Sequence, residues 1–434
     1  MVGRLFGDRR RYGHLDLEAG EKSIRASMHQ IGGVLLEKLL NADSGSYRGT
    51  RIDCGGGHQA RFVEYRWKQV VTVLAPLKLE RAYYHCDECG SGVIPKDQEL
   101  DLLGTSFSPG VRRMMGRVGA KEAFDEGRQD MEELAGIVVK TKEVERVSEA
   151  IGAQVEETYE GERKAIVSGR VVTMQSVPNL YVAVDGTCVP MVGRETEGRK
   201  GRDETGKAKT REAKVGCVFT QTRVDENGYP VRDEQSTSYV GAIEPTEAFG
   251  FRIYAEAMRR GAGRADRVIV LGDGAQWIWA LADMHFPGAV QIVDLYHARE
   301  HLADVAKAVY GAGSQRASDW RAARTAQLDV RGVRGVLASL KRLRPRTSNA
   351  KEIVESAIDY FRGNANRMKY AQFRAEGLFV GSGVVEAACK AVIGLRLKQS
   401  GMRWTVRGAN TIIALRCCQK SNRWEEFWAN RATA

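Results

Sequence analysis

Tyr181-Val-Ala-Val-Asp185-Gly-Thr187 is the first of three short hydrophobic runs that end in an aspartate. The other two are Val268-Ile-Val-Leu-Gly-Asp273-Gly-Ala275 and Val290-Gln-Ile-Val-Asp294-Leu-Tyr-His297. Runs of this length and composition are typical of buried strands in an α/β sheet. Because ligands bind where such strands end, we expect the three carboxylates to converge at one edge. A single Asp-Gly is more often simple turn chemistry, but three on successive strands favour a site.

Helical patterns alternate with these strands. A further strand is predicted over Val215–Thr220, and the stretch from about 298 to 375 is rich in Ala, Arg and Leu, as in helices. Glu386 falls in a later helix, entered through the turn Gly381-Ser-Gly383. The sequence therefore predicts an α/β core that a helical insertion interrupts.

Carboxylates that converge in this way are suited to divalent metal ions. Oxygen ligands suit Mg²⁺, and two such ions can activate the attacking oxygen of a phosphodiester reaction and stabilise the leaving oxygen. We therefore predict a two-metal Mg²⁺ site, which could also accept Mn²⁺.

The composition points to a polyanionic partner. Lys and Arg total 66 against 55 Asp and Glu, which gives a net charge of +11 and a pI near 9.2. A basic balance favours nucleic acid ahead of an anionic membrane surface. No signal peptide or membrane-spanning run is visible, and the eight cysteines do not have the spacing of a disulfide framework. We expect a cytoplasmic protein that does not associate with membranes.

Two pairs of metal-ligand residues lie nearer the N-terminus. Cys54-Gly-Gly-Gly-His58 and Cys86-Asp-Glu-Cys89 are separated by β-type sequence, in which two runs flank Ala75-Pro76 as in a hairpin. Thiolate and imidazole ligands suit tetrahedral zinc, so Cys54, His58, Cys86 and Cys89 are predicted to hold a structural Zn²⁺ in a zinc-ribbon-like unit. His85 is a rival ligand, and reduced cysteines without metal are the alternative.

Taken together, the acidic motifs resemble those of DDE transposases of bacterial insertion sequences. The closest group is the ISKra-type family, which is related to Mutator-type transposases. Besides Asp185-Gly-Thr, Gly272-Asp273-Gly-Ala-Gln-Trp277 and Gly381-Ser-Gly-Val-Val-Glu386, the resemblance rests on Arg81-Ala-Tyr-Tyr-His-Cys-Asp-Glu-Cys89 and Arg396-Leu-Lys-Gln-Ser-Gly-Met-Arg-Trp404. It covers nearly the whole chain.

The resemblance implies an RNase H-like core with a DDE triad. Asp185 would lie on the first strand, Asp273 would follow the fourth, and Glu386 would lie on the helix after an all-helical insertion. Asp294 and His297 would be auxiliary residues of the active site. If Asp273 were only a turn residue, Asp294 would replace it.

These expectations divide the chain into six segments. They are an N-terminal helical segment (1–44), a zinc-ribbon-like domain (45–104), a helical DNA-binding domain (105–175), the first part of the RNase H-like core (176–297), the helical insertion (298–377) and the C-terminal part of the core (378–434).

Two groups of residues are candidates for DNA contacts. The pattern over residues 123–155, two helices separated by a short turn, is typical of a helix-turn-helix, whose second helix can contact bases in the major groove. Its acidic residues, such as Glu143 and Glu145, would repel phosphate, so a plain packing unit is the alternative. The candidate contacts in this region are Lys140, Lys142 and Arg146. Those that follow Glu386 are Arg396, Lys398, Arg403, Trp404 and Arg407.

The predicted function is that of a transposase. It would bind the ends of an insertion sequence and target DNA in the bacterial nucleoid, cut a strand, and join the freed 3′-OH to another phosphodiester. Handling two double-stranded ends together calls for a homodimer or larger homo-oligomer. The alternatives are a nuclease of the same fold that cuts without joining, and a catalytically silent DNA-binding protein derived from a transposase.

Overall fold

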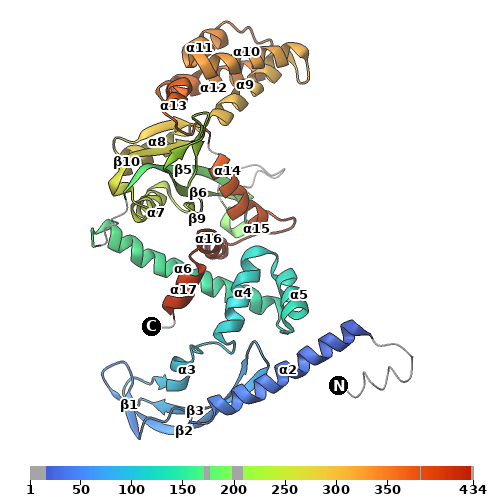
Figure 1. The fold of residues 1–434 in the computed structure, drawn as a ribbon, viewed down its shortest axis with the longest axis vertical. Coiled ribbons are helices and arrows are strands. Elements are labelled where there is room, and N and C mark those ends of the chain that lie inside the picture. Colours follow the sequence, from blue (N-terminus) through green and yellow to red (C-terminus); the bar gives the residue numbers. More distant parts are fainter. Residues whose placement is uncertain (1–15, 171–175, 198–208, 382, 432–434) are drawn as a thin grey trace. The chain divides into compact units, whose positions relative to one another are not determined.

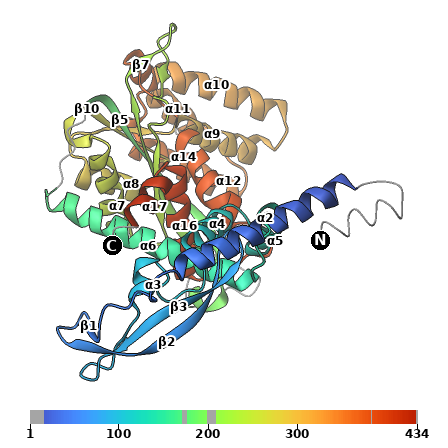
Figure 2. The same ribbon diagram turned by 60° about the horizontal axis from the view of Figure 1, so that its bottom comes forward.

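The computed structural model describes residues 16–170, 176–197, 209–381 and 383–431. Residues 1–15 of the predicted N-terminal segment therefore lie outside the described residues. The chain forms two compact units, one of residues 1–150 with 430–434 and the other of residues 151–429. The elements of both are labelled in two views (Figures 1 and 2). Each unit is described on its own.

The first unit begins with a long helix and an antiparallel sheet. Helix α2 (Leu17–Leu40) is capped by Asp16, whose carboxylate accepts a hydrogen bond from the amide of Ala19 at 3.1 Å. Four strands follow in the sheet order β1-β2-β3-β4: β1 (Arg51–Asp53), β2 (Gln59–Val71), β3 (Pro76–His85) and β4 (Gly92–Val93). The predicted hairpin around Ala75-Pro76 is the β2–β3 pair.

Four helices complete the first unit, and the last of them continues beyond it. They are α3 (Pro95–Glu99), α4 (Pro109–Lys121), α5 (Phe124–Ala135) and α6 (Thr141–Val167). Ser108 caps α4, and α5 ends at Gly136, whose φ of +69° is a left-handed conformation that favours glycine. Helix α6 has 27 residues and contains the boundary between the units, which falls after Ala150.

A mixed five-stranded sheet forms the centre of the second unit. Its order is β11-β10-β5-β6-β9. Strand β6 is antiparallel to both β5 and β9, whereas β10 is parallel to both β5 and β11. The strands are β5 (Val177–Pro190), β6 (Thr210–Gln221), β9 (Ser238–Ala242), β10 (Ala265–Gly272) and β11 (Val290–Val293), with a separate small pair β7 (Arg223–Val224) and β8 (Pro230–Val231).

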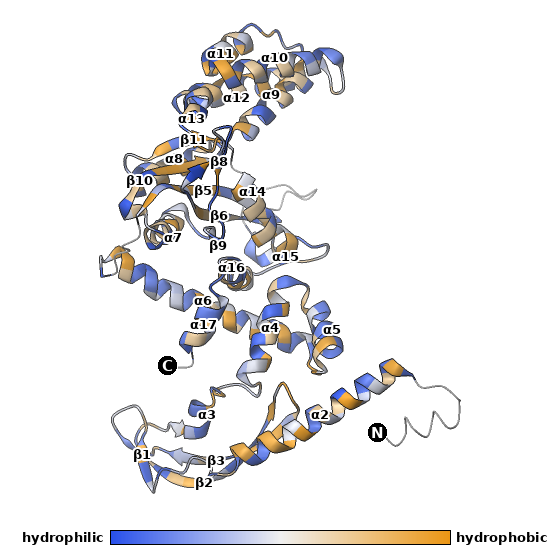
Figure 3. Ribbon diagram, viewed as in Figure 1, coloured by the Kyte–Doolittle hydropathy of each residue, from blue (hydrophilic) through white to orange (hydrophobic). Residues whose placement is uncertain are grey.

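The hydrophobic runs of the sequence form the buried part of this sheet. All four predicted strands lie within β5, β6, β10 and β11. The side chains of β5 from Leu180 to Val184 are completely buried, and Figure 3 shows hydrophobic residues along β5 and β10. Helix α7 (Thr246–Arg259) packs on β5, β6 and β9, while α8 (Gln276–His285) packs on α7. The predicted α/β class is confirmed.

The stretch between β11 and Glu386 is helical, as expected. Five helices gather beyond the β11 side of the sheet (Figure 1): α9 (Leu295–Tyr310), α10 (Gln315–Arg331), α11 (Val333–Lys341), α12 (Ser348–Gly363) and α13 (Tyr370–Ala375). We call α9–α13 the helical segment. The chain then continues through α14 (Gly383–Ala388), a π-helical turn (Cys389–Gly394), α15 (Leu395–Leu397), α16 (Val406–Lys420) and α17 (Trp424–Arg431). Among the described residues, no helix combines the length and the apolar character that crossing a bilayer requires.

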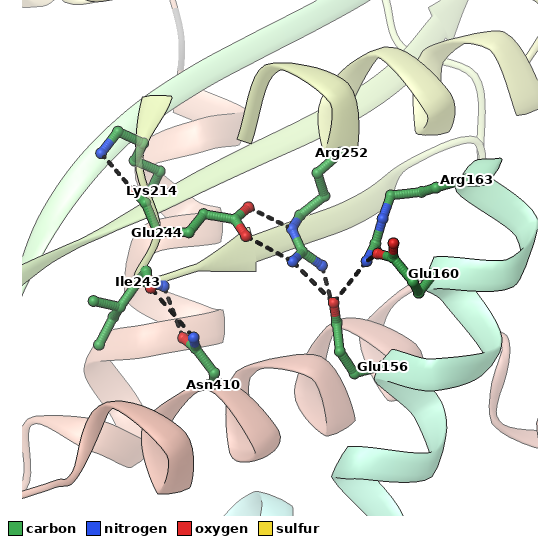
Figure 4. A network of polar contacts seen from close by, with 8 residues as sticks. All are labelled: Glu156, Glu160, Arg163, Lys214, Ile243, Glu244, Arg252 and Asn410. Carbon is green, nitrogen blue, oxygen red and sulfur yellow. Dashed lines mark hydrogen bonds and ion pairs between the residues drawn. The ribbon is translucent and has the colours of Figure 1, made fainter. Parts of the chain in front are cut away.

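A buried ionic network ties three elements of the second unit together (Figure 4). The guanidinium of Arg252 on α7 donates to both oxygens of Glu156 on α6 at 2.9 Å, and to those of Glu244 at 2.7 and 2.9 Å. The Arg252 side chain is only 10% exposed. Arg163 adds a second cation, 2.8 Å from Glu156. Because each charge has partners on both sides, the network can hold α6 against the sheet without leaving a buried charge unpaired.

Replacing Arg252 tests this network. Arg252→Met keeps most of the apolar volume but leaves Glu156 and Glu244 facing each other without their shared cation. We expect the free energy of unfolding of this unit to fall by about 3 kcal/mol, measured by chemical denaturation. Lys164→Met, which removes an exposed partner of Glu160, is the control and should change it by less than about 1 kcal/mol. Equal effects of the two variants would refute a stabilising role for the network.

Candidate functional site

The register of the parallel strands brings two aspartates to the same level. Leu271 of β10 pairs with Ala183 of β5, and Asp273 and Asp185 each lie two residues further along. Neighbouring strands are separated by roughly 4.8 Å, so the two residues start from adjacent backbone positions. The negative charge of Asp273 raises the pKa of Asp185, as expected for near neighbours.

Asp294 lies at the same edge on the next strand. Its amide donates to the carbonyl of Gly272 at 2.8 Å, which places it beside Asp273. Its carboxylate caps α9 and accepts hydrogen bonds from the amides of Tyr296 and His297 at 2.6 and 3.0 Å. Asp294 is buried, at 6% exposure. The Asp294 carboxylate is thus buried and bound to the N-terminus of α9, whereas Asp185 and Asp273 are half-buried and more accessible to solvent.

Asp185 has an unusual electrostatic environment. Burial raises its pKa above the ordinary value, and the negative charge of Asp273 raises it further. The thiol of Cys389, the amide of Gly186 and the His297 ring act in the opposite direction. The amide of Gly186 donates to Asp185 Oδ1 at 2.7 Å. Neighbouring carboxylates whose negative charges repel each other are suited to bind a cation together.

Asp273 lies in a tight turn after β10. Its Oδ1 accepts a hydrogen bond from the amide of Ala275 at 2.8 Å, which closes the turn. Gly274 between them has a φ of +108°, in the left-handed region that only glycine adopts readily. Asp273-Gly274 therefore forms a turn and at the same time places the Asp273 carboxylate at the edge of the sheet.

Glu386 is less closely associated with the two aspartates. It is exposed on α14, which packs against β5 and β6. Cys389, whose thiol hydrogen-bonds to Asp185, follows Glu386 by one helical turn on the same side. In the described part of the chain, however, the only group of three or more Cys, His, Asp or Glu ligand atoms within 4.8 Å of one another is the Cys54 cluster below. Asp185, Asp273 and Glu386 therefore do not form such a close group.

Sequence reasoning missed two residues near this edge. His297, which was predicted, lies near Asp185, and its Nδ1 is 3.3 Å from Glu300 Oε2. His301, one turn later on α9, packs edge-on to His297 and stacks on Tyr360 with 3.9 Å between ring centroids. The spacing of four residues between the histidines could have revealed His301. Tyr360 comes from α12, and no local sequence signal pointed to it.

The four predicted zinc ligands come together in the first unit. The ligand atoms of Cys54, His58, Cys86 and Cys89 all lie within 4.8 Å of one another, so this cluster could hold a metal ion such as zinc. The turn from Cys54 to His58 joins β1 to β2, and the turn containing Cys86 and Cys89 joins β3 to β4. The antiparallel pairing of β2 with β3 brings the two turns together.

The chemistry of the cluster fits a bound cation. Nδ1 of His58 is buried and has no hydrogen-bond partner among the described residues, which leaves an orphaned ligand atom within the cluster. The neighbouring His58 ring, and after it Ser91, lower the pKa of the Cys89 thiol to about 6 and so favour the thiolate. The rival ligand His85 lies outside the cluster, with Nε2 3.8 Å from Asp87.

The predicted DNA-contacting residues divide into exposed and buried ones. Exposed residues are Lys140, Lys142, Arg146, Lys398, Arg403 and Arg407. Lys142 pairs with Glu145 at 2.9 Å on α6. Lys398 lies next to the aspartate edge, where its ammonium donates to the Thr187 hydroxyl at 2.5 Å.

The structure places two of the predicted DNA contacts, Arg396 and Trp404, inside the protein. Arg396 is 0% exposed and lies over the Trp404 ring, 5.0 Å from its centroid. Trp404 is 7% exposed, and its indole N–H donates to the carbonyl of Leu397 at 3.0 Å. Both side chains pack among the C-terminal helices, where the attraction between the guanidinium and the indole face offsets part of the cost of burying the charge. Neither can reach a DNA backbone in this arrangement.

Disrupting the Cys54 cluster should remove its metal. Cys89→Ser substitutes a hydroxyl, a poor zinc ligand, for a thiolate. We expect the purified variant to lose most of its zinc, measured by elemental analysis, and to melt at a lower temperature. Cys188→Ser changes an exposed cysteine outside the cluster and should retain the metal. Equal metal content in both variants would refute the cluster as a metal site.

The protonation of Asp185 generates a second prediction. Because the pKa of Asp185 is higher in the folded than in the unfolded protein, its protonated form stabilises the fold. This contribution is complete at a pH below the unfolded pKa and is lost as the pH rises through the folded pKa. At about pH 7 the ionised Asp185 therefore costs stability, so Asp185→Asn should raise the melting temperature of the metal-free protein by roughly 2 °C. The difference should shrink as the pH falls toward 4, the ordinary range of an aspartate.

Asp233→Asn is the matched control with the opposite sign. Burial would raise the pKa of Asp233, but hydrogen bonds from Thr220 and Thr222 lower it overall. Removing its charge should therefore lower the melting temperature at about pH 7. Destabilisation by both substitutions would contradict the proposed strain between the carboxylates at the sheet edge.

No protein-family model and no curated protein matches this sequence. The function of the chain is therefore inferred from its own residues and their arrangement.

Proposed function

We propose that this chain is a Mg²⁺-dependent DNA transposase with an RNase H-like core. The observation that carries the proposal is the pairing of Asp185 with Asp273 at one edge of a mixed sheet. The strand order also supports it, since β5 is the first strand of the sheet along the chain and β10 is the fourth. These are the positions that the resemblance to DDE transposases requires of the two aspartates.

Asp185 and Asp273 would be the main metal ligands, and Glu386 would complete the site. Carboxylate oxygens are the ligands that Mg²⁺ prefers, and the mutual repulsion of the two aspartates favours a cation between them. When bound, Mg²⁺ would supply charge stabilisation and activation of oxygen nucleophiles. Because Asp294 is committed to capping α9, Asp273 is the better second ligand.

The surrounding residues would orient the carboxylates and the DNA. The Gly186 amide and the Cys389 thiol fix Asp185, while Lys398, held at Thr187, places a cation beside the edge for a phosphate. The His297 ring lies near enough to Asp185 for its charge to favour the ionised carboxylate. Glu386 must approach the aspartates when DNA and metal bind, because the described residues do not already cluster it with them.

The distribution of charge supports a DNA substrate. Residues 295–375 of the helical segment carry 16 Lys and Arg against 7 Asp and Glu, a net charge of +9 compared with +11 for the whole chain. The tract from Lys341 to Arg346 includes four exposed basic residues: Lys341, Arg342, Arg344 and Arg346. Basic side chains beside a catalytic edge can hold a DNA backbone without reading its sequence.

The remaining parts of the proposal concern DNA recognition and assembly. Helices α5 and α6 flank a turn at Gly136 and would form the helix-turn-helix, with Lys140, Lys142 and Arg146 exposed near the start of α6. Zinc in the Cys54 cluster would be structural. Joining DNA requires two ends to be held together, so the active form would be a homodimer or larger assembly in the bacterial nucleoid.

Cleavage and joining of labelled DNA from the ends of the element test the proposal. The intact protein should cut one strand and join its 3′-OH to a second DNA with Mg²⁺. Asp185→Asn, Asp273→Asn and Glu386→Gln should bind the same DNA but lose activity by at least about 100-fold. Asp294→Asn, which keeps an oxygen acceptor for the α9 cap, should retain more activity.

Each other result has a definite meaning. Cutting without joining would indicate a nuclease of the same fold. DNA binding with neither reaction would indicate a catalytically silent DNA-binding protein. Loss of activity in Asp294→Asn but not in Asp273→Asn would make Asp294 the second ligand.

A further inference from the structure

Helix α12 contacts the turn that carries Asp273. The hydroxyl of Tyr360 donates to the backbone carbonyl of Asp273 at 2.8 Å. The side-chain amide of Asn364, the residue that caps the C-terminal end of α12, donates to the carbonyl of Gly274 at 3.2 Å. Two successive carbonyls of the turn are thus held by residues about 90 positions away in the chain.

Asn364 is itself fixed in orientation. The indole N–H of Trp279 donates to Asn364 Oδ1 at 2.8 Å, so the amide must direct its NH₂ toward the turn. Asn364 and Trp279 are each 5% exposed. Trp279 belongs to α8, the helix that follows the Asp273 turn, so the contact is anchored on both sides.

The contact between Tyr360 and the turn is also tight. A Cβ built on Gly274 would lie 2.5 Å from the Tyr360 ring, so only glycine fits between the turn and α12. His301 stacks on Tyr360 at 3.9 Å between ring centroids. The ring is therefore held between α9 and the turn and cannot withdraw without repacking both.

From these contacts we infer that Tyr360 and Asn364 are positioning residues for the Asp273 carboxylate. This inference rests on the proposed function, in which Asp273 binds metal. Within the turn itself, the amide of Ala275 donates to Asp273 Oδ1, and the contacts from Tyr360 and Asn364 hold the turn from outside. A metal ligand needs a fixed backbone, because small displacements weaken coordination. The helical segment is thus part of the metal site as well as a basic surface.

Tyr360→Phe tests the inference, and the chain offers a closely matched control. Tyr370 on α13 is completely buried, and its hydroxyl has no hydrogen-bond partner among the described residues. Tyr370→Phe therefore removes the same atom from the same helical segment without breaking a contact to the turn. Asn364→Ala removes the second contact to the turn, so it tests the same role with a change at a different position.

Three measurements on the full chain separate positioning from general destabilisation. Tyr360→Phe should speed amide hydrogen exchange at Asp273–Ala275 by about fivefold to tenfold, the effect of losing one hydrogen bond. It should also weaken binding of Mn²⁺, used as a probe in calorimetry, and raise the Mg²⁺ concentration for half-maximal cleavage by a similar factor. DNA affinity should not change. Asn364→Ala should act in the same direction, and Tyr370→Phe should match the wild type.

The outcomes are distinguishable from failure of the proposed function. If Tyr360→Phe and Asn364→Ala match Tyr370→Phe in exchange and in Mn²⁺ binding, the inference is overturned. If the wild type binds Mn²⁺ at Asp273 but cuts no DNA, the transposase proposal fails, and the exchange and binding data still decide the positioning role. If the wild type binds no Mn²⁺ that depends on Asp273, both fail.

Discussion

The parallel pairing of β5 with β10 is the constraint on which the second unit depends. These strands are the first and fourth of the sheet along the chain, and their register places Asp185 and Asp273 at the same level. A shift of one residue would turn every side chain of one strand to the other face. The burial of Leu180–Val184 makes that shift costly, so the hydrophobic core fixes the distance between two carboxylates.

A similar logic applies in the first unit on a smaller scale. The β2–β3 pairing brings two distant turns together and forms the Cys54 cluster. Here the hydrophobic core around Ala82 and Tyr84 is small, and a bound metal would add the stability that apolar burial cannot supply. In the second unit the core positions two carboxylates, whereas in the first unit a metal bound by the Cys54 cluster would reinforce the core.

The elements could be predicted from the sequence better than the contacts between them. Strand ends, the hairpin at Ala75-Pro76 and the four Cys and His ligands follow from local patterns, because periodicity and turn residues act over a few positions. Tyr360 and Asn364 could not be found in this way, since their partners lie about 90 residues earlier. The burial of Arg396 could not be predicted either, because the sequence after Glu386 does not show whether a guanidinium faces solvent or packs on an indole ring.

The position of α12 within the chain determines when, during synthesis, the Asp273 turn gains its contacts with Tyr360 and Asn364. Asp185 and Asp273 leave the ribosome first, but the helix that braces the Asp273 turn and the helix that carries Glu386 follow only after α9–α11. Chains are made from the N-terminus and fold in that order, so a growing polypeptide holds two carboxylates that are not yet braced. A product that stops before residue 383 would lack Glu386 and Cys389 altogether. If the chain is the transposase proposed above, it would gain cutting activity only when almost all of it has been translated, and incomplete copies would leave the DNA near their own gene intact.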